Sequence, residues 1–369
     1  MLYLIPWAWD TANIYKGLDE GYNIMVRILY GLCSVGIGHA IRAKTILKHL
    51  KKKNEIMTIT SHRAYDILSK ESDNVYNIEG LEVLYHNNKA LTLKTILKNI
   101  GKFSVNNYQK LKGVGKKIDD FKPQVVISDW ESVSSFTARA RKILLISLDN
   151  QAYLKYGKYK KPFMLYLQYL KARFFLKTLV READHSIVML WPGMELKKKE
   201  GLYGVSPIIR DEIKEARKKK GDHILVYDST RNHEKLMGVL REIKMKFIVY
   251  GYDRVAKEGN IQFKGFDDTK EFVKDLTSCK AVITNAGFTL ISECLYLEKP
   301  LLCIPIRKHF EQILNARYVK KYGYGEMNYR LSVKNVRNFI KNLKNYNYKK
   351  PDFKEDLLET LDKILKSVN

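Results

Sequence analysis

A histidine behind a glycine-rich loop is the first residue of this sequence that could perform chemistry. His39 directly follows Gly36 and Gly38, and an aliphatic run at 26–32 precedes them. Glycines let the backbone approach a ligand closely, and the N-terminus of the helix expected after them favours anions. An imidazole in that first helical turn could accept a proton from an attacking hydroxyl. A capping histidine in an ordinary tight turn is the alternative.

A second candidate site follows another apolar run, which ends at Thr284. Gly287 would allow a diphosphate to rest on the N-terminus of the next helix, whose first turn contains Phe288 and Thr289. Glu293, nearly two turns into this helix, could accept hydrogen bonds from both hydroxyls of a ribose. The alternative is an acid that the helix dipole alone favours near a helix N-terminus.

Basic and amide side chains gather after a third apolar run, which ends at Pro305. Arg307 and Lys308 add positive charge at its carboxyl end, and Gln312 and Asn315 lie three positions apart on the following helix. Groups of this kind at one edge of a sheet suit the hydroxyls of a sugar. An ordinary solvated helix start is the alternative.

These candidate sites follow strands in a pattern typical of α/β proteins. A strand at 26–32, a glycine loop, a helix at 39–53 and a strand at 56–60 form one βαβ unit, whose first loop opens a ligand crevice. Further apolar runs lie at 83–85, 124–128, 143–148 and 186–189, and a second series at 223–227, 246–250, 261–263, 280–284 and 301–304. We therefore expect an α/β fold with two doubly wound, Rossmann-like domains that face each other across a cleft.

The same pattern divides the chain. The first domain is expected at 25–190, a proline- and glycine-containing linker at 191–221, the second domain at 222–345 and a closing helix at 346–369. Residues 1–24 show no clear period. They are either an extension outside the native chain, which would then begin at Met25, or a peripheral extension of it.

Composition limits the class of protein. The 369 residues are 45% hydrophobic and 29% charged, which is the balance of a folded protein and excludes disorder over most of the length. The longest run without a formal charge, at 28–41, is shorter than the roughly 20 residues of a membrane-spanning helix. Four cysteines form no CxxC pair, so we expect buried thiols in a cytoplasmic protein and no metal site.

The net charge of +26 suits anionic partners, namely nucleic acid, anionic lipid or phosphorylated substrates. The basic residues are spread along the chain, so host composition explains the charge equally well. No RNP-like, KH, zinc-finger or helix-turn-helix signature is visible, and we expect no nucleic acid as partner. A basic nucleic-acid-binding protein is kept as an alternative class.

Together these motifs resemble the nucleotide-sugar-dependent glycosyltransferases of the GT-B fold. The closest branch contains the N-acetylglucosaminyltransferase that acts on the lipid-linked peptidoglycan precursor. The resemblance covers roughly 25–345 and rests on the GxGH that ends at His39, on 287–293, on Glu298-Lys299-Pro300, on Ile304-Pro305 and on 312–316. It implies a transferase whose second domain binds a nucleotide-sugar co-substrate, with no further cofactor, and whose first domain binds an acceptor that is lipid-linked in that branch. A nucleotide-sugar 2-epimerase of the same fold is the alternative enzyme.

The resemblance also assigns roles to residues. Glu293 is similar to the ribose-binding acid, Gly287 to the turn that contacts the diphosphate, Gln312 and Asn315 to residues on the side of the donor sugar, and His39 to the general base. One departure concerns the loop at 227–231, which lacks the glycine pair expected there.

Mechanistic expectations follow from the same chemistry. The sequence contains no Asp-x-Asp, so we expect no metal at the leaving diphosphate. We expect Arg231, Arg307 and Lys308 to stabilise the negative charge of this diphosphate instead. Retaining enzymes of this fold often have a glutamate eight positions before the ribose-binding acid; Asn285 stands there, which favours inversion. Asp129, after the strand at 124–128, could orient His39 and stabilise its imidazolium.

The segment 162–181 combines aromatic and aliphatic residues with the basic stripe Arg173, Lys177 and Arg181. Such a helix could lie in an anionic membrane surface, with about 1 kcal/mol gained per basic residue. This would make the protein peripheral on the inner face of the membrane. A helix buried between domains or in a dimer is the alternative.

Overall fold

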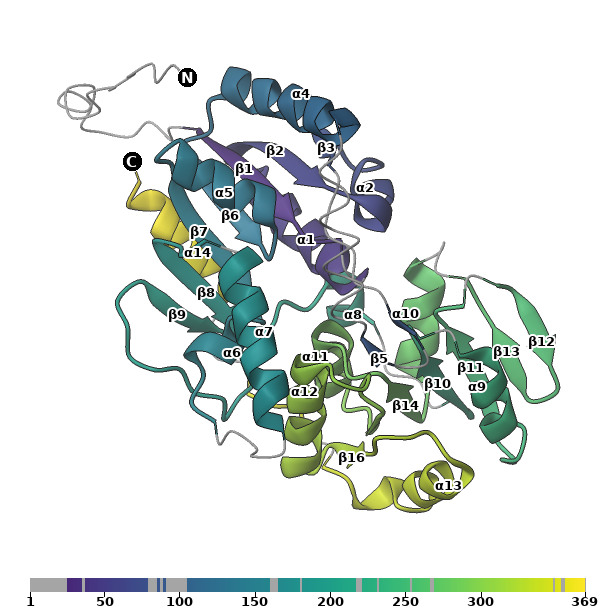
Figure 1. Ribbon diagram of the computed structural model, residues 1–369. Coiled ribbons are helices and arrows are strands. Elements are labelled where there is room, and N and C mark those ends of the chain that lie inside the picture. The colour runs from purple at the N-terminus through teal and green to yellow at the C-terminus, as the bar shows by residue number, and fades with distance from the viewer. Residues whose placement is uncertain are drawn as a thin grey trace.

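The computed structural model describes the chain from 25 to 368, apart from 35–36, 79–84, 87–88, 91–104, 160–164, 180, 217–220, 231, 253, 266–268, 348 and 353–355. The expected extension at 1–24, Gly36 and Arg231 therefore lie outside the described residues. The chain forms two α/β units, the first purple to teal and the second mostly green in Figure 1.

The first sheet contains the strand that leads into the glycine loop. Its seven strands lie in the order β3-β2-β1-β6-β7-β8-β9, with parallel pairing throughout. The strands are β1 (Val26–Leu32), β2 (Asn54–Thr60), β3 (Val75–Asn77), β6 (Val125–Asp129), β7 (Leu144–Asp149), β8 (His185–Met189) and β9 (Leu202–Val205), and a separate pair joins β4 (Tyr85–His86) to β5 (Lys89–Ala90). The helices are α1 (Ile37–Leu50), α2 (His62–Leu68), α4 (Val105–Phe121), α5 (Ser132–Ala140), α6 (Tyr153–Tyr156) and α7 (Tyr166–Leu179).

The second sheet repeats this plan. Its order is β12-β13-β11-β10-β14-β15-β16, and only the β12–β13 pair is antiparallel among the described strands. The strands are β10 (His223–Tyr227), β11 (Lys246–Tyr250), β12 (Ala256–Glu258), β13 (Ile261–Phe263), β14 (Ala281–Thr284), β15 (Leu301–Cys303) and β16 (Gly325–Met327). The described helices from residue 211 onward are α8 (Asp211–Lys214), α9 (His233–Leu240), α10 (Thr269–Ser278), α11 (Phe288–Tyr296), α12 (Phe310–Lys321), α13 (Val333–Lys341), the 3-10 helix η3 (Leu343–Asn345) and α14 (Leu357–Lys366).

Each sheet has a switch point, where the strand order reverses direction. In the first it lies between β1 and β6, and in the second between β10 and β14. Parallel strands place their carboxyl ends at one edge, and ligands of doubly wound sheets bind in the crevice at the switch point. These two edges are therefore the expected positions of ligand-binding and catalytic side chains.

The boundary expected at 190 differs from the observed one. Strand β9, inside the expected linker at 191–221, pairs in parallel with β8 and so belongs to the first sheet. Its residues Leu202–Val205 have only one fully buried position, which is the weak apolar signal of an edge strand. The chain crosses to the second domain after Val205, through α8.

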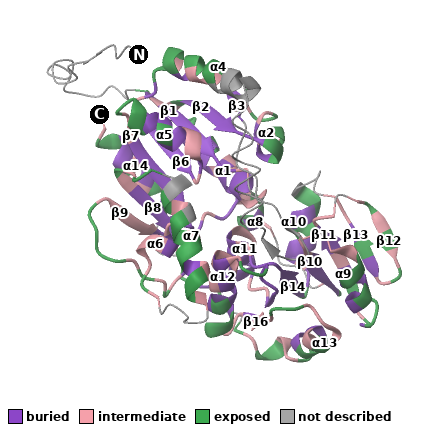
Figure 2. Cartoon of the chain, in the orientation of Figure 1, coloured by how far each residue is buried: buried purple, intermediate pink, exposed green. Residues whose placement is uncertain are grey.

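The last helix returns to the first domain. Helix α14 buries Leu357, Leu361, Ile364 and Leu365 and contacts β8 and β9. Figure 1 shows this yellow helix among the teal strands of the first unit. One buried hydrophobic cluster runs through both domains, with Trp191 between them, and Figure 2 shows the buried strands in purple.

Candidate active site

The histidine of the glycine loop is paired with an aspartate from the neighbouring strand. His39 Nδ1, in the first turn of α1, lies 2.8 Å from Oδ1 of Asp129, the last residue of β6. Both side chains are buried. An ionised carboxylate only accepts hydrogen bonds, so this pair is a hydrogen bond in the tautomer with the proton on Nδ1, in which Nε2 is the acceptor; Arg42 Nη2, a donor, lies at the same distance of 2.8 Å from Nδ1. The structure thus brings together the two residues that the sequence analysis assigned to catalysis.

An arginine completes this group. Arg42 Nε donates to Asp129 Oδ2 at 2.9 Å, and its Nη2 contacts both Asp129 Oδ1 and, at 2.8 Å, His39 Nδ1. Burial alone would raise the pKa of the Asp129 carboxyl, but Arg42 and His39 hold that pKa below its usual value. Arg42 therefore keeps Asp129 ionised beside the histidine.

Gln151, which follows β7, and Trp130, which follows β6, both contact the histidine ring. Gln151 Nε2 lies 3.2 Å from His39 Nε2, and Gln151 Oε1 is buried without a hydrogen-bond partner among the described residues. The ring of Trp130 stacks on His39 with centroids 6.2 Å apart. Burial raises the pKa of the Asp149 carboxyl to about 7. Gln151 thus occupies the position that an acceptor hydroxyl would need at Nε2.

Glu131, two residues beyond Asp129, has a local structural role. Its carboxylate caps α5 by accepting hydrogen bonds from the backbone N–H groups of Val133 and Ser134 at 2.7 and 2.6 Å. An N-terminal cap of this kind satisfies helix N–H groups that have no partner within the helix. Glu131 is therefore a poorer candidate for a base than His39.

The second domain touches the first at this edge. Asn150 accepts from Arg42 Nη1 at 2.9 Å and donates to Oε1 of Glu311, on α12, at 2.9 Å. Thr289 Oγ1 donates to the Gly38 carbonyl at 3.4 Å. A Cβ on Gly38 would lie 2.8 Å from the Thr289 hydroxyl oxygen. Gly38 is therefore required for the close approach of α11 to α1.

The predicted ribose acid is held in a buried ion pair. Both carboxylate oxygens of Glu293 accept hydrogen bonds from Arg210, at 2.6 and 2.9 Å, and the residue is 2% exposed. Phe288 is also buried, stacked on Trp191 at 4.5 Å. Neither side chain is exposed, and their roles toward a donor stay predictions. Arg210 was missed because it lies in the expected linker, 83 residues away in sequence.

The remaining predicted donor residues lie around the start of α11 and α12. Gly287 is the N-cap of α11. Asn315 is buried and donates to the Ala286 carbonyl at 3.1 Å, and Gln312 Oε1 accepts from the Ile306 N–H at 2.9 Å. Two further predicted residues, Arg307 and Lys308, are exposed in the loop before α12. These contacts fix the loops at the sheet edge, whereas the roles of the side chains toward a donor stay predictions.

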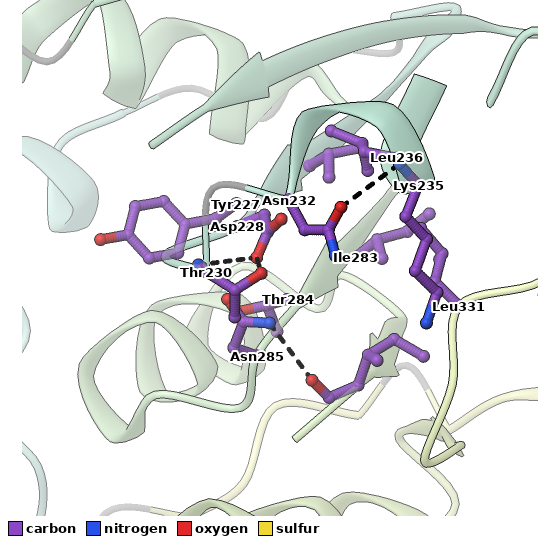
Figure 3. A pocket seen from close by; sticks show the side chains of 12 residues that line it. Tyr227, Asp228, Thr230, Asn232, Lys235, Leu236, Ile283, Thr284, Asn285 and Leu331 are labelled. Carbon is purple, nitrogen blue, oxygen red and sulfur yellow. Dashed lines mark hydrogen bonds between the residues drawn. The ribbon is translucent and has the colours of Figure 1, made fainter. Parts of the chain in front are cut away.

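A pocket opens at the switch point of the second sheet, and we refer to it as the switch-point pocket. It is lined by apolar and polar residues, namely Val226, Tyr227, Asp228, Thr230, Asn232, Lys235, Leu236, Ile283, Thr284, Asn285, Ile304 and Leu331. Figure 3 shows the Lys235 nitrogen beside Leu331, across the pocket from the turn formed by Asp228 and Thr230. The sequence analysis noted this loop only for its missing glycines, although the β10 and β14 strands that flank it were predicted.

Helix α7 has two different faces. Tyr169 is buried against Leu154 and Phe310, so this face packs between the domains. The opposite face exposes Leu167 at 71% and Phe174 at 68%, together with Tyr166 and Leu170. Lys177 is exposed, and Arg173 is exposed as well but donates from Nη1 to the hydroxyl of Tyr169 at 2.8 Å. None of the helices in the described ranges is long and apolar enough to cross a membrane.

Comparison with known proteins gives one family and several relatives. The family model described as "Glycosyl transferase family 1" matches residues 26–344. A UDP-N-acetylglucosamine–N-acetylmuramyl-(pentapeptide) pyrophosphoryl-undecaprenol N-acetylglucosamine transferase of Bacillus cereus is 37% identical over 76 residues, and the match spans only 20% of this chain and 21% of that protein. An uncharacterized glycosyltransferase of Methanosarcina mazei is 23% identical over 82% of this chain and 86% of its own.

Solved structures share the arrangement of the two domains. MurG of Acinetobacter baumannii superimposes with a TM-score of 0.53 and 12% identity, covering 93% of this chain and 99% of its own. The glycotransferase of kitacinnamycin gives a TM-score of 0.59 and 11% identity, covering 94% and 95%. At these identities the likeness concerns the fold.

Proposed function

The chain belongs to glycosyl transferase family 1, and from this premise we propose that it transfers the sugar of a uridine diphosphate donor to an acceptor hydroxyl, with inversion and without a metal. The predicted GT-B fold, with two Rossmann-like domains, and the predicted class, a nucleotide-sugar glycosyltransferase, are confirmed by the family and the solved structures. The nucleotide, the stereochemistry and the individual residue roles belong to the proposal.

The buried pair of His39 and Asp129 is the observation that supports this mechanism most directly. His39 Nε2 would take the proton of the acceptor hydroxyl while that oxygen bonds to the anomeric carbon of the sugar. The bond from this carbon to the diphosphate breaks, and its electron pair leaves on the diphosphate oxygen. One displacement of this kind inverts the anomeric centre. Asp129 accepts the hydrogen bond from Nδ1 and stabilises the imidazolium that forms.

The neighbours of the histidine set two conditions for this step. Gln151 must turn away from His39 Nε2 before an acceptor hydroxyl can reach that nitrogen, because both would use the same lone pair. Arg42 places a positive charge 2.8 Å from Nδ1, which opposes the imidazolium, while Asp129 offsets that charge. The step therefore requires that Gln151 move away and that Asp129 stay beside both His39 and Arg42.

The leaving diphosphate is proposed to be stabilised by protein groups. The absence of an Asp-x-Asp motif from the whole sequence supports this view. Arg307 and Lys308 are exposed at the edge of the second sheet and available for this purpose, and the N-terminus of α11 offers unpaired N–H groups at Gly287 and beyond. Contacts with the donor sugar are assigned to Gln312 and Asn315, on α12.

The acceptor is proposed to be lipid-linked and reached from the cytoplasmic face of a membrane. The relative from Bacillus cereus is named for a pyrophosphoryl-undecaprenol acceptor. In this chain, Leu167, Leu170 and Phe174 form an exposed apolar face on α7, with basic side chains beside it. Such a face suits the boundary between lipid headgroups and acyl chains. Figure 2 shows exposed residues in green along this helix.

A product assay tests the proposal. The protein is incubated with UDP-, GDP- and dTDP-sugars in turn and with a polyprenyl-diphosphate-linked sugar as acceptor, with and without a chelator. We expect product from a UDP-sugar only, an anomeric configuration opposite to that of the donor by NMR, and no loss of rate with the chelator. A retained configuration, or a rate that requires added Mg²⁺, would overturn the corresponding part of the mechanism.

A further inference from the structure

One buried amide joins the neighbours of the histidine to the second domain. Asn150, directly after β7, accepts a hydrogen bond from Arg42 Nη1 at 2.9 Å and donates one to Glu311 Oε1, on α12, at 2.9 Å. A guanidinium can only donate and an ionised carboxylate can only accept, so the Asn150 oxygen must face Arg42 and its nitrogen must face Glu311. Asn150 is 5% exposed. This amide is therefore fixed in one orientation by groups from both domains.

Through this amide, an unbroken series of hydrogen bonds runs from the second domain to the proposed base. Arg42 Nε donates to Asp129 Oδ2 at 2.9 Å, and Asp129 Oδ1 contacts His39 Nδ1 at 2.8 Å. The series consists of Glu311, Asn150, Arg42, Asp129 and His39, and every member from Asn150 onward is buried. Hydrogen bonds in a buried network strengthen one another, because the protein interior screens them weakly. A change at the domain boundary can therefore reach the histidine.

The arginine of this series can interact with the histidine in two ways. Arg42 Nη2 contacts Asp129 Oδ1 and also lies 2.8 Å from His39 Nδ1. In one tautomer Nδ1 carries the proton and donates a hydrogen bond to Asp129, which leaves Nε2 able to take a proton from an acceptor hydroxyl. In the other tautomer Nδ1 accepts from Arg42, and Nε2 carries the proton and cannot act as a base. The placement of the guanidinium thus decides whether the histidine is a competent base.

Asn150 opposes the second of these arrangements. A guanidinium is planar, and its N–H groups form a rigid fork. Asp129 binds this fork at Nε and Nη2, and Asn150 binds it at Nη1. With both sides bound, the guanidinium cannot turn to direct Nη2 at His39 Nδ1 without breaking a buried hydrogen bond, which is costly. Glu311 in turn prevents the Asn150 amide from turning away.

We propose that Asn150 is a positioning residue, which sets the tautomer of His39 by holding Arg42 on Asp129, and that Glu311 secures it from the second domain. This inference rests on the proposed function, in which His39 Nε2 takes the proton of the acceptor. It adds a condition to that function, because the base is prepared for proton transfer only while α12 contacts the first domain. A separation of the two domains would free Arg42 to donate to Nδ1.

Matched variants at the domain boundary test this proposal. Asn150→Leu removes both hydrogen bonds and keeps the approximate size of the side chain. Asn150→Asp keeps an oxygen for Arg42 but places a carboxylate against that of Glu311, which repels it. The double variant Asn150→Asp/Glu311→Gln restores the bond with donor and acceptor exchanged, and its net charge equals that of the parent. Asn338→Leu, at an exposed position on α13, is the control.

The NMR signals of the His39 ring nitrogens report its tautomer directly and need no substrate. They are recorded above neutral pH and identified by their absence from His39→Ala. We expect a protonated Nδ1 and an unprotonated Nε2 in the parent and the control, a shift toward the opposite tautomer in both Asn150 single variants, and the signals of the parent in the double variant. Unchanged His39 signals in Asn150→Leu, or a double variant that resembles Asn150→Asp, would overturn the inference.

Turnover and UDP affinity give a second measurement. A general base contributes about 10²–10⁴-fold to a rate, so we expect Asn150→Leu to lower kcat about ten- to a hundredfold. The double variant should recover most of this loss, and the dissociation constant of UDP should stay that of the parent throughout.

The outcomes separate this inference from the proposed function. A lower kcat and melting temperature in Asn150→Leu without a change in the His39 signals would show a merely structural role and would overturn the inference. Normal turnover in Asn150→Leu, while His39→Ala is inactive, would overturn the inference alone. An active His39→Ala would overturn the proposed mechanism as well.

Discussion

The carboxyl edges of the two sheets carry different kinds of side chain. At the first switch point, His39, Arg42 and Asp129 fill the edge with a buried group of hydrogen bonds. At the second, the equivalent edge is a pocket lined by apolar residues together with polar ones such as Asp228 and Lys235. One edge thus suits proton transfer, and the other offers a pocket to a ligand. In the proposed reaction, the first edge would supply the base and the second domain would bind the donor.

The buried carboxylates of the two domains sharpen this difference. Asp129 and Glu293 each pair with an arginine, but only Asp129 also contacts a histidine. The oxygens of Glu293 are both taken by Arg210. A buried carboxylate beside an arginine is therefore not in itself a sign of a catalytic role. The feature that distinguishes Asp129 is its additional contact with His39.

Loss of the histidine should have the largest effect. We expect His39→Ala to lower turnover about 10²–10⁴-fold while nucleotide affinity changes little, because the base and the donor belong to different domains. His49→Ala, on the same helix and paired with Asp362, is the control. Turnover is measured per folded molecule, alongside the melting temperature. Near-normal turnover in His39→Ala would remove the first domain's edge from the chemistry.

Membrane binding should also belong to the first domain. Replacing Arg173, Lys177 and Arg181 by Glu should abolish co-sedimentation with anionic vesicles, since each basic residue contributes about 1 kcal/mol. Nucleotide affinity should be unchanged. The experiment compares parent and triple variant at low and high salt. Equal sedimentation of both proteins would show that α7 is not the contact.

The role of Glu293 separates binding from structure in the second domain. If this carboxylate binds the ribose, Glu293→Gln should weaken the nucleotide by roughly 1.5–3 kcal/mol. If it serves only the ion pair with Arg210, the melting temperature should fall and the affinity per folded molecule should stay. Calorimetric titration and thermal unfolding of the same preparation distinguish these outcomes.

The smallest expected effect concerns pH. Burial raises the pKa of Asp149 in the folded protein to about 7, above its unfolded value, so the folded state holds this proton longer than the unfolded chain does. Stability from this group is therefore present at low pH and falls as pH rises toward 7. Asp149→Asn should be more stable than the parent at pH 8, by at least about 2 °C in melting temperature, and should lose this advantage at pH 4. A pH-independent difference would contradict the prediction.

Strands with continuous apolar runs could be predicted from the sequence, whereas short edge strands could not. β1, β10, β11 and β13 begin and end where the pattern placed them. β9 and β16, near or at the edges of the sheets, have few buried apolar residues and were missed. Edge strands bury fewer side chains, so their periodicity is weak.

Site residues could be predicted where they directly follow strands. Partners that are distant in the sequence could not be predicted. His39 and Asp129 each follow a strand end, so the topology alone brought them near each other. Arg210 pairs with a residue 83 positions away, and Asn150 with one 161 positions away, which no local pattern reveals. Thr284 ended a predicted strand, but the burial of its hydroxyl, without a partner among the described residues, depends on packing that no local pattern reveals.

The return of α14 makes the second domain an insertion within the first. The chain leaves the first domain after β9 and comes back into it with α14, so two covalent connections join the domains. Two covalent connections permit the domains to open and close about a hinge but restrict the twisting of one domain relative to the other. A pulling force applied at β1 and α14 would load the first domain alone. The second domain would thus bear no load until the first domain gave way.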